Sequence, residues 1–106
     1  MKKQILMQYG DLRLEREEVE KRIKKSQMEG LSKEHIQVLI ERIVMIDRKL
    51  SKIERFINEI DDSRIRRIIS LKYIEGLTWG QVAQKMGSVY TEEGCRKLLE
   101  RFLKDV

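Results

Sequence analysis

One run of residues constrains the fold more than any other feature of the chain, because its apolar side chains recur at alternating steps of three and four. The run consists of Ile36, Leu39, Ile43, Ile46, Leu50, Ile53, Ile57 and Ile60. This spacing places every member on one stripe of an α-helix and is typical of a coiled-coil seam. We therefore expect a helix from about residue 33 to residue 60, with the Ser32 hydroxyl as its N-cap.

The segment before this helix carries a weaker stripe, at Ile5, Tyr9, Leu12, Val19 and Ile23. Arg16 and Ser26 occupy two positions where apolar residues would fit the repeat. Gly30 lies between the two stripes and predicts a turn, because glycine adopts turn conformations at little cost. Two helices joined by so short a connection fold back most simply as an antiparallel hairpin.

The apolar face of the second helix is wider than one partner helix covers, because Ile40, Val44 and Phe56 lie beside its seam. We therefore expect residues 1–60 to form a hairpin or coiled-coil oligomerisation arm, with a dimer favoured and a structural spacer as the alternative. The seam does not decide between parallel and antiparallel pairing. On this interpretation, a lysine at Ile46 or Ile53 breaks self-association.

The composition favours an all-α protein. The 106 residues include no proline and six glycines, and 39% of them are charged. Glu, Lys, Arg and Leu lose little rotamer freedom in a helix. The length suits one small domain, or a small domain with a helical extension, and leaves little room for an enclosed active site. The net charge of +5 is compatible with a nucleic-acid partner without requiring one.

Several classes of function are not expected. The single cysteine, Cys95, excludes an internal disulfide and fits a reducing cytoplasm. One cysteine and one histidine, His35, cannot assemble a zinc site, so no metal or cofactor is expected and His35 is expected to be solvated. The sequence offers no nucleophile with a base and no paired carboxylates, so we expect no enzyme. An apolar run of roughly 18 residues is also lacking, and we expect a cytoplasmic protein without a membrane partner.

A second domain, residues 61–106, is expected to begin at the polar run 61–63, because Asp and Ser side chains cap helices. A helix is predicted from Arg64 to about Glu75, ending at Gly76. Thr78 is then expected to cap a short helix. The inward face of that helix is Trp79, Val82, Ala83 and Met86.

After a turn at residues 87–90, Thr91 is expected to cap a last helix over 91–104. The inward face of this last helix is Cys95, Leu98, Leu99 and Phe102. Two short helices joined by a short turn that contains glycine fit a helix-turn-helix. A small residue at Ala83 and a glycine at Gly87 allow the close crossing and the tight turn that this motif needs. We therefore predict a three-helix helix-turn-helix domain.

The stretches LKYIEGLTWGQVAQKMG and TEEGCRKLLERFL, within residues 63–104, resemble the fourth conserved region of bacterial sigma factors. They also resemble the small phage-encoded transcription regulators that share this helix-turn-helix. In that family the last helix enters the major groove of DNA. The resemblance implies that Glu92, Glu93, Arg96 and Lys97 supply DNA contacts. The run 88–90 lengthens the turn relative to the family, and Glu92 stands where a basic residue is frequent, so promoter specificity is not carried over.

The chemistry of the outward face suits DNA independently of the resemblance. Arg96 is suited to a bidentate pair with guanine, and Glu93 to accepting from the N4 amino group of cytosine. Lys97, Arg101 and Lys104 are suited to phosphates. For Glu92 and Glu93, the alternative is that they stabilise the helix N-terminus through its dipole.

Trp79 and Cys95 are expected in the core rather than at a ligand. The arginines at 64, 66 and 67 either contact the DNA backbone or are solvated. The leading hypothesis is a phage- or prophage-encoded, sequence-specific transcriptional regulator. As a dimer it would place two recognition helices at half-sites about one helical turn, roughly 34 Å, apart.

Contact with RNA polymerase follows from the family analogy alone. Two alternatives remain open. One is the DNA-recognition subunit of a phage packaging machine, similar to a small terminase, which would form a ring. The other is a helical protein-interaction module that does not bind DNA.

Overall fold

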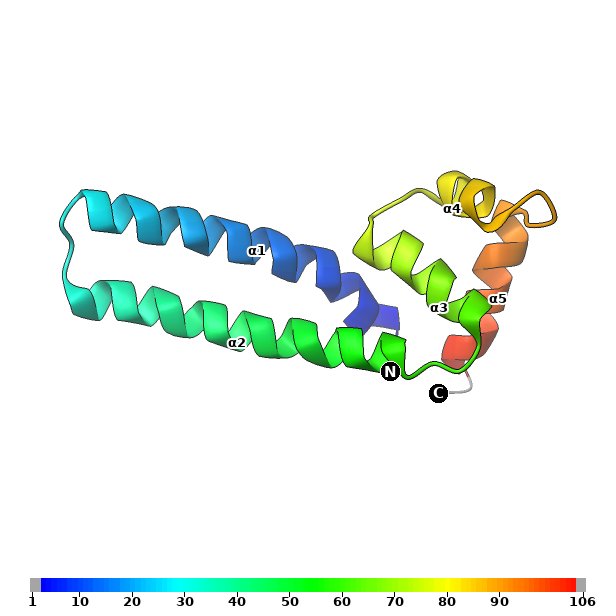
Figure 1. Ribbon diagram of the computed structural model, residues 1–106, viewed down its shortest axis with the longest axis horizontal. Coiled ribbons are helices and arrows are strands. Elements are labelled where there is room, and N and C mark those ends of the chain that lie inside the picture. Colours follow the sequence, from blue (N-terminus) through cyan, green and yellow to red (C-terminus); the bar gives the residue numbers. More distant parts are fainter. Residues whose placement is uncertain (1–2, 105–106) are drawn as a thin grey trace.

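A computed structural model describes residues 3–104 of the chain, and this part is all-helical, as predicted. The elements in order are α1 (Lys3–Met28), α2 (Lys33–Asn58), α3 (Ser63–Ile69), the π-helical turn η1 (Ser70–Ile74), α4 (Trp79–Met86) and α5 (Glu92–Lys104). The helices α1 and α2 form an antiparallel hairpin, here called the arm (Figure 1). The remaining helices, here called the triplet, gather at one end of the arm, and the molecule measures 56 × 25 × 17 Å.

The turn at the tip of the arm forms where the sequence predicts it. Gly30 has a φ of +70°, which glycine adopts without strain. The Ser32 hydroxyl accepts a hydrogen bond of 3.2 Å from the backbone N–H of His35, so Ser32 is the N-cap of α2. The helix α2 ends at Asn58, two residues before the predicted end, because the chain must turn toward α3.

The arm is held together by the two predicted stripes, with one correction. The seam residues of α2 are buried except Ile36 and Ile43, which are half-buried. On α1 the prediction of Ile5 is wrong, because Ile5 is 39% exposed whereas Leu6 is fully buried. The helix α1 contacts η1 as well as α2, and the contact with η1 explains why Leu6 is buried in place of Ile5.

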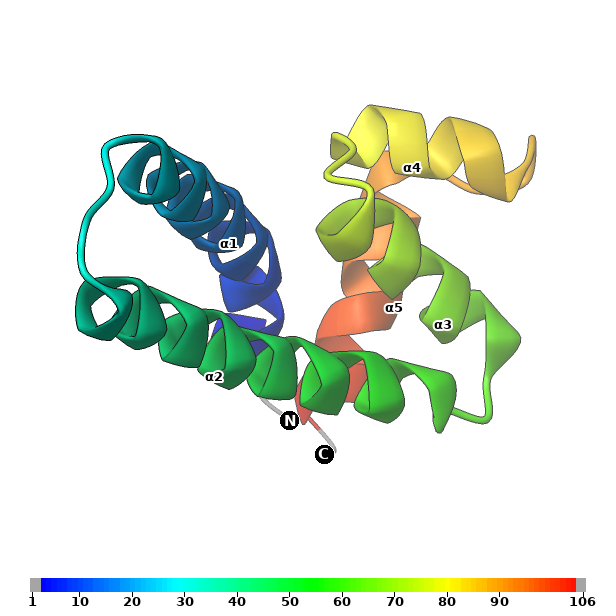
Figure 2. The same cartoon turned by 60° about the vertical axis from the view of Figure 1, so that its left-hand side comes forward.

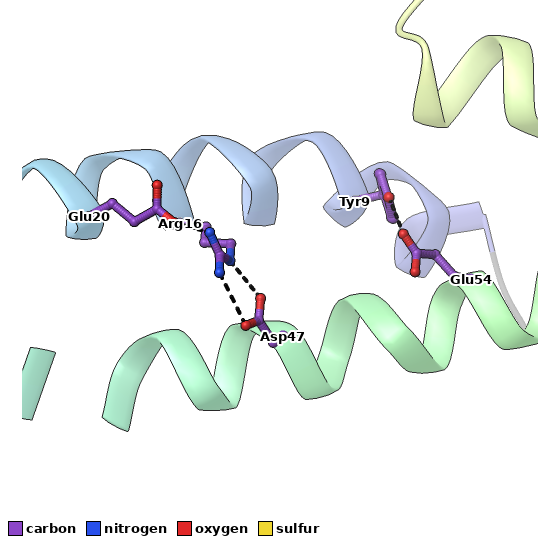
Figure 3. Close-up of polar contacts among 5 residues, drawn as sticks. All are labelled: Tyr9, Arg16, Glu20, Asp47 and Glu54. Carbon is purple, nitrogen blue, oxygen red and sulfur yellow. Dashed lines mark hydrogen bonds and ion pairs between the residues drawn. The ribbon is translucent and has the colours of Figure 1, made fainter. Parts of the chain in front are cut away.

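Two polar contacts tie α1 to α2 along one flank of the arm (Figure 3). Arg16, which interrupts the apolar stripe, reaches Asp47 with 2.6 Å between Nε and Oδ1 and also pairs with Glu20. The Tyr9 hydroxyl donates to a Glu54 carboxylate oxygen at 2.5 Å. Both bonds cross from one helix to the other, so they fix the register of the hairpin as well as its separation.

The Tyr9 bond gives a prediction that depends on pH. Burial, with the neighbouring Glu54 carboxylate, raises the pKa of Tyr9 from 10.0 to about 12. Because the folded pKa is the higher one, the stabilisation is complete below pH 10 and is lost as the pH rises to 12. We expect Tyr9→Phe to lower the free energy of unfolding by about 0.5–1.5 kcal/mol at pH 8. Denaturant titrations at pH 8 and pH 11 should show this difference shrinking, and an equal difference at both values would contradict it.

The core runs from the base of the arm into the triplet without a break. It includes Leu6 of α1, Ile57 of α2, Ile68 of α3, Val82 of α4 and Leu99 of α5. Phe56, which was expected to need a second subunit, is half-buried and packs with its ring centroid 6.4 Å from that of Phe102. That part of the oligomer prediction is wrong, because α5 of the same chain covers Phe56.

The first helix of the triplet departs from the prediction of one helix from Arg64 to Glu75. It begins at Ser63 with Asp62 as N-cap, and its second half widens into the π-helical turn η1. The wider turn is closed by a hydrogen bond of 2.9 Å from the Glu75 N–H to the Ser70 carbonyl. Gly76 ends the segment with a φ of +71°, as expected.

No helix of the described residues combines the length and the apolar character that a membrane crossing requires.

Candidate nucleic-acid interface

The helix α4 is positioned by its cap and by its buried face. Thr78 and Gln81 form a capping box, in which the Thr78 hydroxyl accepts from the Gln81 N–H and the Gln81 side chain accepts from the Thr78 N–H. Val82, Ala83 and Met86 are buried, as the spacing predicts. Gly87 then stops the helix with a φ of +124°. A helix of eight residues is thereby fixed at both ends and along one side.

The helix α5 follows a short turn and packs by one face only. The Tyr90 N–H donates to the Gly87 carbonyl at 3.0 Å, and the Thr91 hydroxyl accepts from the Gly94 N–H at 3.0 Å. Cys95 and Leu99 are buried, and Leu98 and Phe102 are half-buried at the edge of the core. Figure 2 shows α4 lying across the N-terminal end of α5.

The six predicted site residues all lie on α5 with exposed side chains: Glu92, Glu93, Arg96, Lys97, Arg101 and Lys104. The opposite face of α5 packs into the core. The exposure of the six side chains is therefore set by the packing of the helix and not by the conformation of a loop. The structure therefore brings the set together on one rigid surface. The positive charges extend from Arg96 to Lys104, over the last two and a half turns or so at about 3.6 residues per turn.

Trp79 lies at the edge of the core, half-buried, and its ring faces two cations. The Lys72 Nζ is 5.1 Å from the centre of the ring, and the Arg96 guanidinium carbon is 5.9 Å from it. Both distances allow a cation–π attraction, which favours a cation over the face of an indole. Trp79 thus packs as predicted, and it also restrains the side chain of Arg96.

The two acidic side chains at the start of α5 have different neighbours. Glu93 pairs with Lys97 one turn later, with 3.3 Å between the charged atoms. Glu92 reaches toward the first turn of α4, where its Oε1 atom lies 2.6 Å from the position a Cβ would take at Gly80. Both carboxylates lie in the first turn of α5, where the helix dipole favours negative charge.

The arginines at the start of the triplet have internal partners that spacing did not reveal. Arg66 donates to the Ile60 carbonyl at 2.6 Å, and Arg67 donates to the Lys85 carbonyl at 3.3 Å in the last turn of α4. Arg64 pairs with Asp62 at 2.9 Å and, through that hydrogen bond, lowers the pKa of Asp62 to about 2. The three arginines thus bind groups at the ends of neighbouring helices or in the connections between them.

Cysteine and histidine each occur once in the chain, as Cys95 and His35. Burial raises the pKa of the Cys95 thiol, which disfavours the reactive thiolate. His35 is exposed, as expected. Among residues 3–104 there is no group of three His, Cys, Asp or Glu side chains that could hold a metal ion.

Three-dimensional proximity supplies one feature that the sequence analysis missed, the grouping of Lys72, Trp79 and Arg96 from η1, α4 and α5. No fixed spacing in the sequence predicts this grouping, because the three residues belong to different elements.

Comparison of the chain with models of protein families, with curated proteins and with solved structures finds no match.

Proposed function

We propose that the protein is a sequence-specific DNA-binding regulator of transcription, encoded by a phage or prophage, that reads the major groove with α5. The observation that carries the proposal is the exposed charged face of α5, on which four cations outnumber three carboxylates. The cations are Arg96, Lys97, Arg101 and Lys104, and the carboxylates are Glu92, Glu93 and Glu100. A helix that packs by one face and presents four cations on the other fits the major groove, which is about 12 Å wide.

The roles of the side chains follow from their places on α5. Arg96 and Glu93 lie in the N-terminal half, where a recognition helix contacts base edges. Arg101 and Lys104 lie in the C-terminal half and suit phosphates, which supply most of the affinity. Glu92, with its carboxylate toward α4, holds the two helices in register, and Lys97 exchanges Glu93 for a phosphate when DNA binds.

The arm is proposed to bring two copies together. Four apolar side chains of α2 remain exposed: Val38 at 61%, Ile40 at 40%, Val44 at 44% and Met45 at 59%. Val38 and Met45 are the most exposed of the four and lie seven residues apart on the same side of the helix, and exposed apolar surface of this kind favours a protein partner over water. A homodimer in the cytoplasm is the favoured assembly, and contact with RNA polymerase rests on the sigma-like resemblance.

The decisive experiment is a DNA titration at several salt concentrations. We expect sequences selected from random DNA to bind specifically, with log K falling about 0.9 per phosphate neutralised as log salt rises. Absence of binding near physiological salt would refute the proposal and favour a protein-interaction module. Analytical ultracentrifugation separates a dimeric regulator from the ring expected of a packaging subunit.

A further inference from the structure

A line of exposed side chains follows α2 along the flank of the arm opposite the Arg16–Asp47 pair. Its members, at steps of three and four, are Val38, Glu41, Met45, Lys49 and Lys52. Steps of this kind keep all five on one side of the helix, within a narrow stripe. Val38 and Met45 are among the most exposed apolar side chains of the arm, at 61% and 59%.

A shallow groove lies beside this stripe, between α1 and α2. The buried side chains of Leu12 and Ile46 contribute to it, and Val38 and Met45 stand along it. Glu15, Glu41, Arg42 and Lys49 add charges of both signs to the lining. Neither Glu41 nor Lys49 takes part in an ion pair within residues 3–104.

We propose that the occupant of this stripe is a second copy of the same chain, packed with its α2 antiparallel and with the two-fold axis beside Met45. The inference deepens the self-association part of the proposed function and rests on it. Glu41 and Lys49 lie four residues before and four residues after Met45. An antiparallel two-fold therefore places each Glu41 beside the partner's Lys49, twice per dimer.

The same symmetry orders the rest of the stripe. Val38 and Lys52 are each seven residues from Met45, so the aliphatic stem of each Lys52 covers the partner's Val38 while its ammonium stays in water. Met45 meets the partner's Met45 at the centre, where a flexible thioether adapts to an irregular gap. Residue 45 is also close to the middle of α2, so this register overlaps nearly the whole of both helices.

Charge argues against the parallel arrangement. A parallel two-fold brings each residue opposite its own copy, so Glu41 would face Glu41, and Lys49 and Lys52 would each face lysine. Like charges at such positions repel, and pairing of opposite charges is the usual determinant of helix orientation. The antiparallel register replaces these repulsions with two attractions.

The other flank of α2 is the less favourable surface. Its apolar residues Ile40 and Val44 are more covered, at 40% and 44% exposure. Nearby Asp47 is already engaged by Arg16. The Met45 flank exposes more apolar surface and keeps its charges free, which makes it the better match for a second copy.

This arrangement alters the expected spacing of the DNA sites. Each triplet lies beyond the Asn58 end of its own α2, and the two ends point in opposite directions from the axis. A helix of 26 residues is about 39 Å long at about 1.5 Å per residue. The two α5 helices are then farther apart than one turn of DNA, so half-sites should be spaced by more than the roughly 34 Å first expected.

The test is the mass in solution of Met45→Lys, measured by sedimentation over a range of concentrations. We expect its dimer dissociation constant to rise at least about tenfold, since two ammonium groups meet at the centre of the interface. Val44→Lys is the matched control, because it adds the same charge to an exposed neighbour on the other flank. Circular dichroism should show both variants folded, since both positions are exposed.

A charge exchange tests the orientation. We expect Glu41→Lys and Lys49→Glu each to weaken the dimer about tenfold, and the double variant to recover to within about threefold of the wild type. Lack of recovery in the double variant, or a loss with Val44→Lys instead of Met45→Lys, overturns the inference. A monomeric wild type refutes self-association itself, and none of these three results bears on whether α5 binds DNA.

Discussion

Replacing Ile53 with lysine is expected to lower the free energy of unfolding by about 3–5 kcal/mol, the largest stability effect we foresee for an arm substitution. Ile53 is 3% exposed and belongs to the core that joins the arm to the triplet. A lysine at this position removes the apolar contacts of Ile53 and buries an unpaired ammonium group away from water. For a small domain with a stability of about 5–15 kcal/mol, this change is large enough to populate the unfolded state.

The structure changes what this substitution tests. From the sequence, Ile46→Lys and Ile53→Lys were expected to break self-association, but both residues are buried within one chain. The variant should therefore lose helix content and unfold at lower denaturant even when the protein is too dilute to associate. Urea titration followed by circular dichroism measures the effect, with Val44→Lys as the exposed control. A stable, folded Ile53→Lys monomer would show that α1 and α2 do not pack as described.

Arg96→Ala is expected to weaken binding to a selected DNA sequence by about 1–3 kcal/mol, or about 5- to 150-fold, and to relax preference at one base pair. The guanidinium carbon lies 5.9 Å from the centre of the Trp79 ring, and the planar fork of N–H donors of an arginine suits a guanine. Lys104→Ala should weaken binding to all sequences similarly and reduce the salt slope by about one. Fluorescence anisotropy with specific and scrambled duplexes separates the two effects.

A substitution of Trp79 gives a second test of the role of Arg96. If the indole restrains Arg96, Trp79→Phe should reduce sequence preference in the wild-type background but have little further effect beside Arg96→Ala. Trp79 is the single tryptophan of the chain, so its fluorescence also reports on DNA binding. If Arg96→Ala and Lys104→Ala weakened DNA binding equally on every sequence, the assignment of Arg96 to base recognition would be wrong.

Local patterns predicted the elements well because the relevant forces act within one or two helical turns. The stripes placed α1 and α2, and the caps Ser32, Thr78 and Thr91 were each identified from a hydroxyl before an apolar run. Gly30 and Gly76 marked two turns that have positive φ. The exposed face of α5 also followed, since the positions of its apolar residues leave only one side for the charges.

Contacts between distant segments were beyond these patterns. The burial of Leu6 in place of Ile5 depends on η1, and the cover over Phe56 comes from Phe102, 46 positions later in the chain. Periodicity identifies an apolar face but not the element that covers it. For that reason the sequence overstated how much of α2 needs a second subunit.

The sequence by itself determined an all-helical chain, the long hairpin and the charged outer face of its last helix, because helix periodicity and capping are local properties. Only the tertiary structure decided which side chains contact one another across helices and which stay exposed. Arg96 lies over Trp79, Arg67 donates to the Lys85 carbonyl, and Met45 is left exposed at the middle of α2. Such choices depend on how elements pack in three dimensions, and packing is set by the whole core.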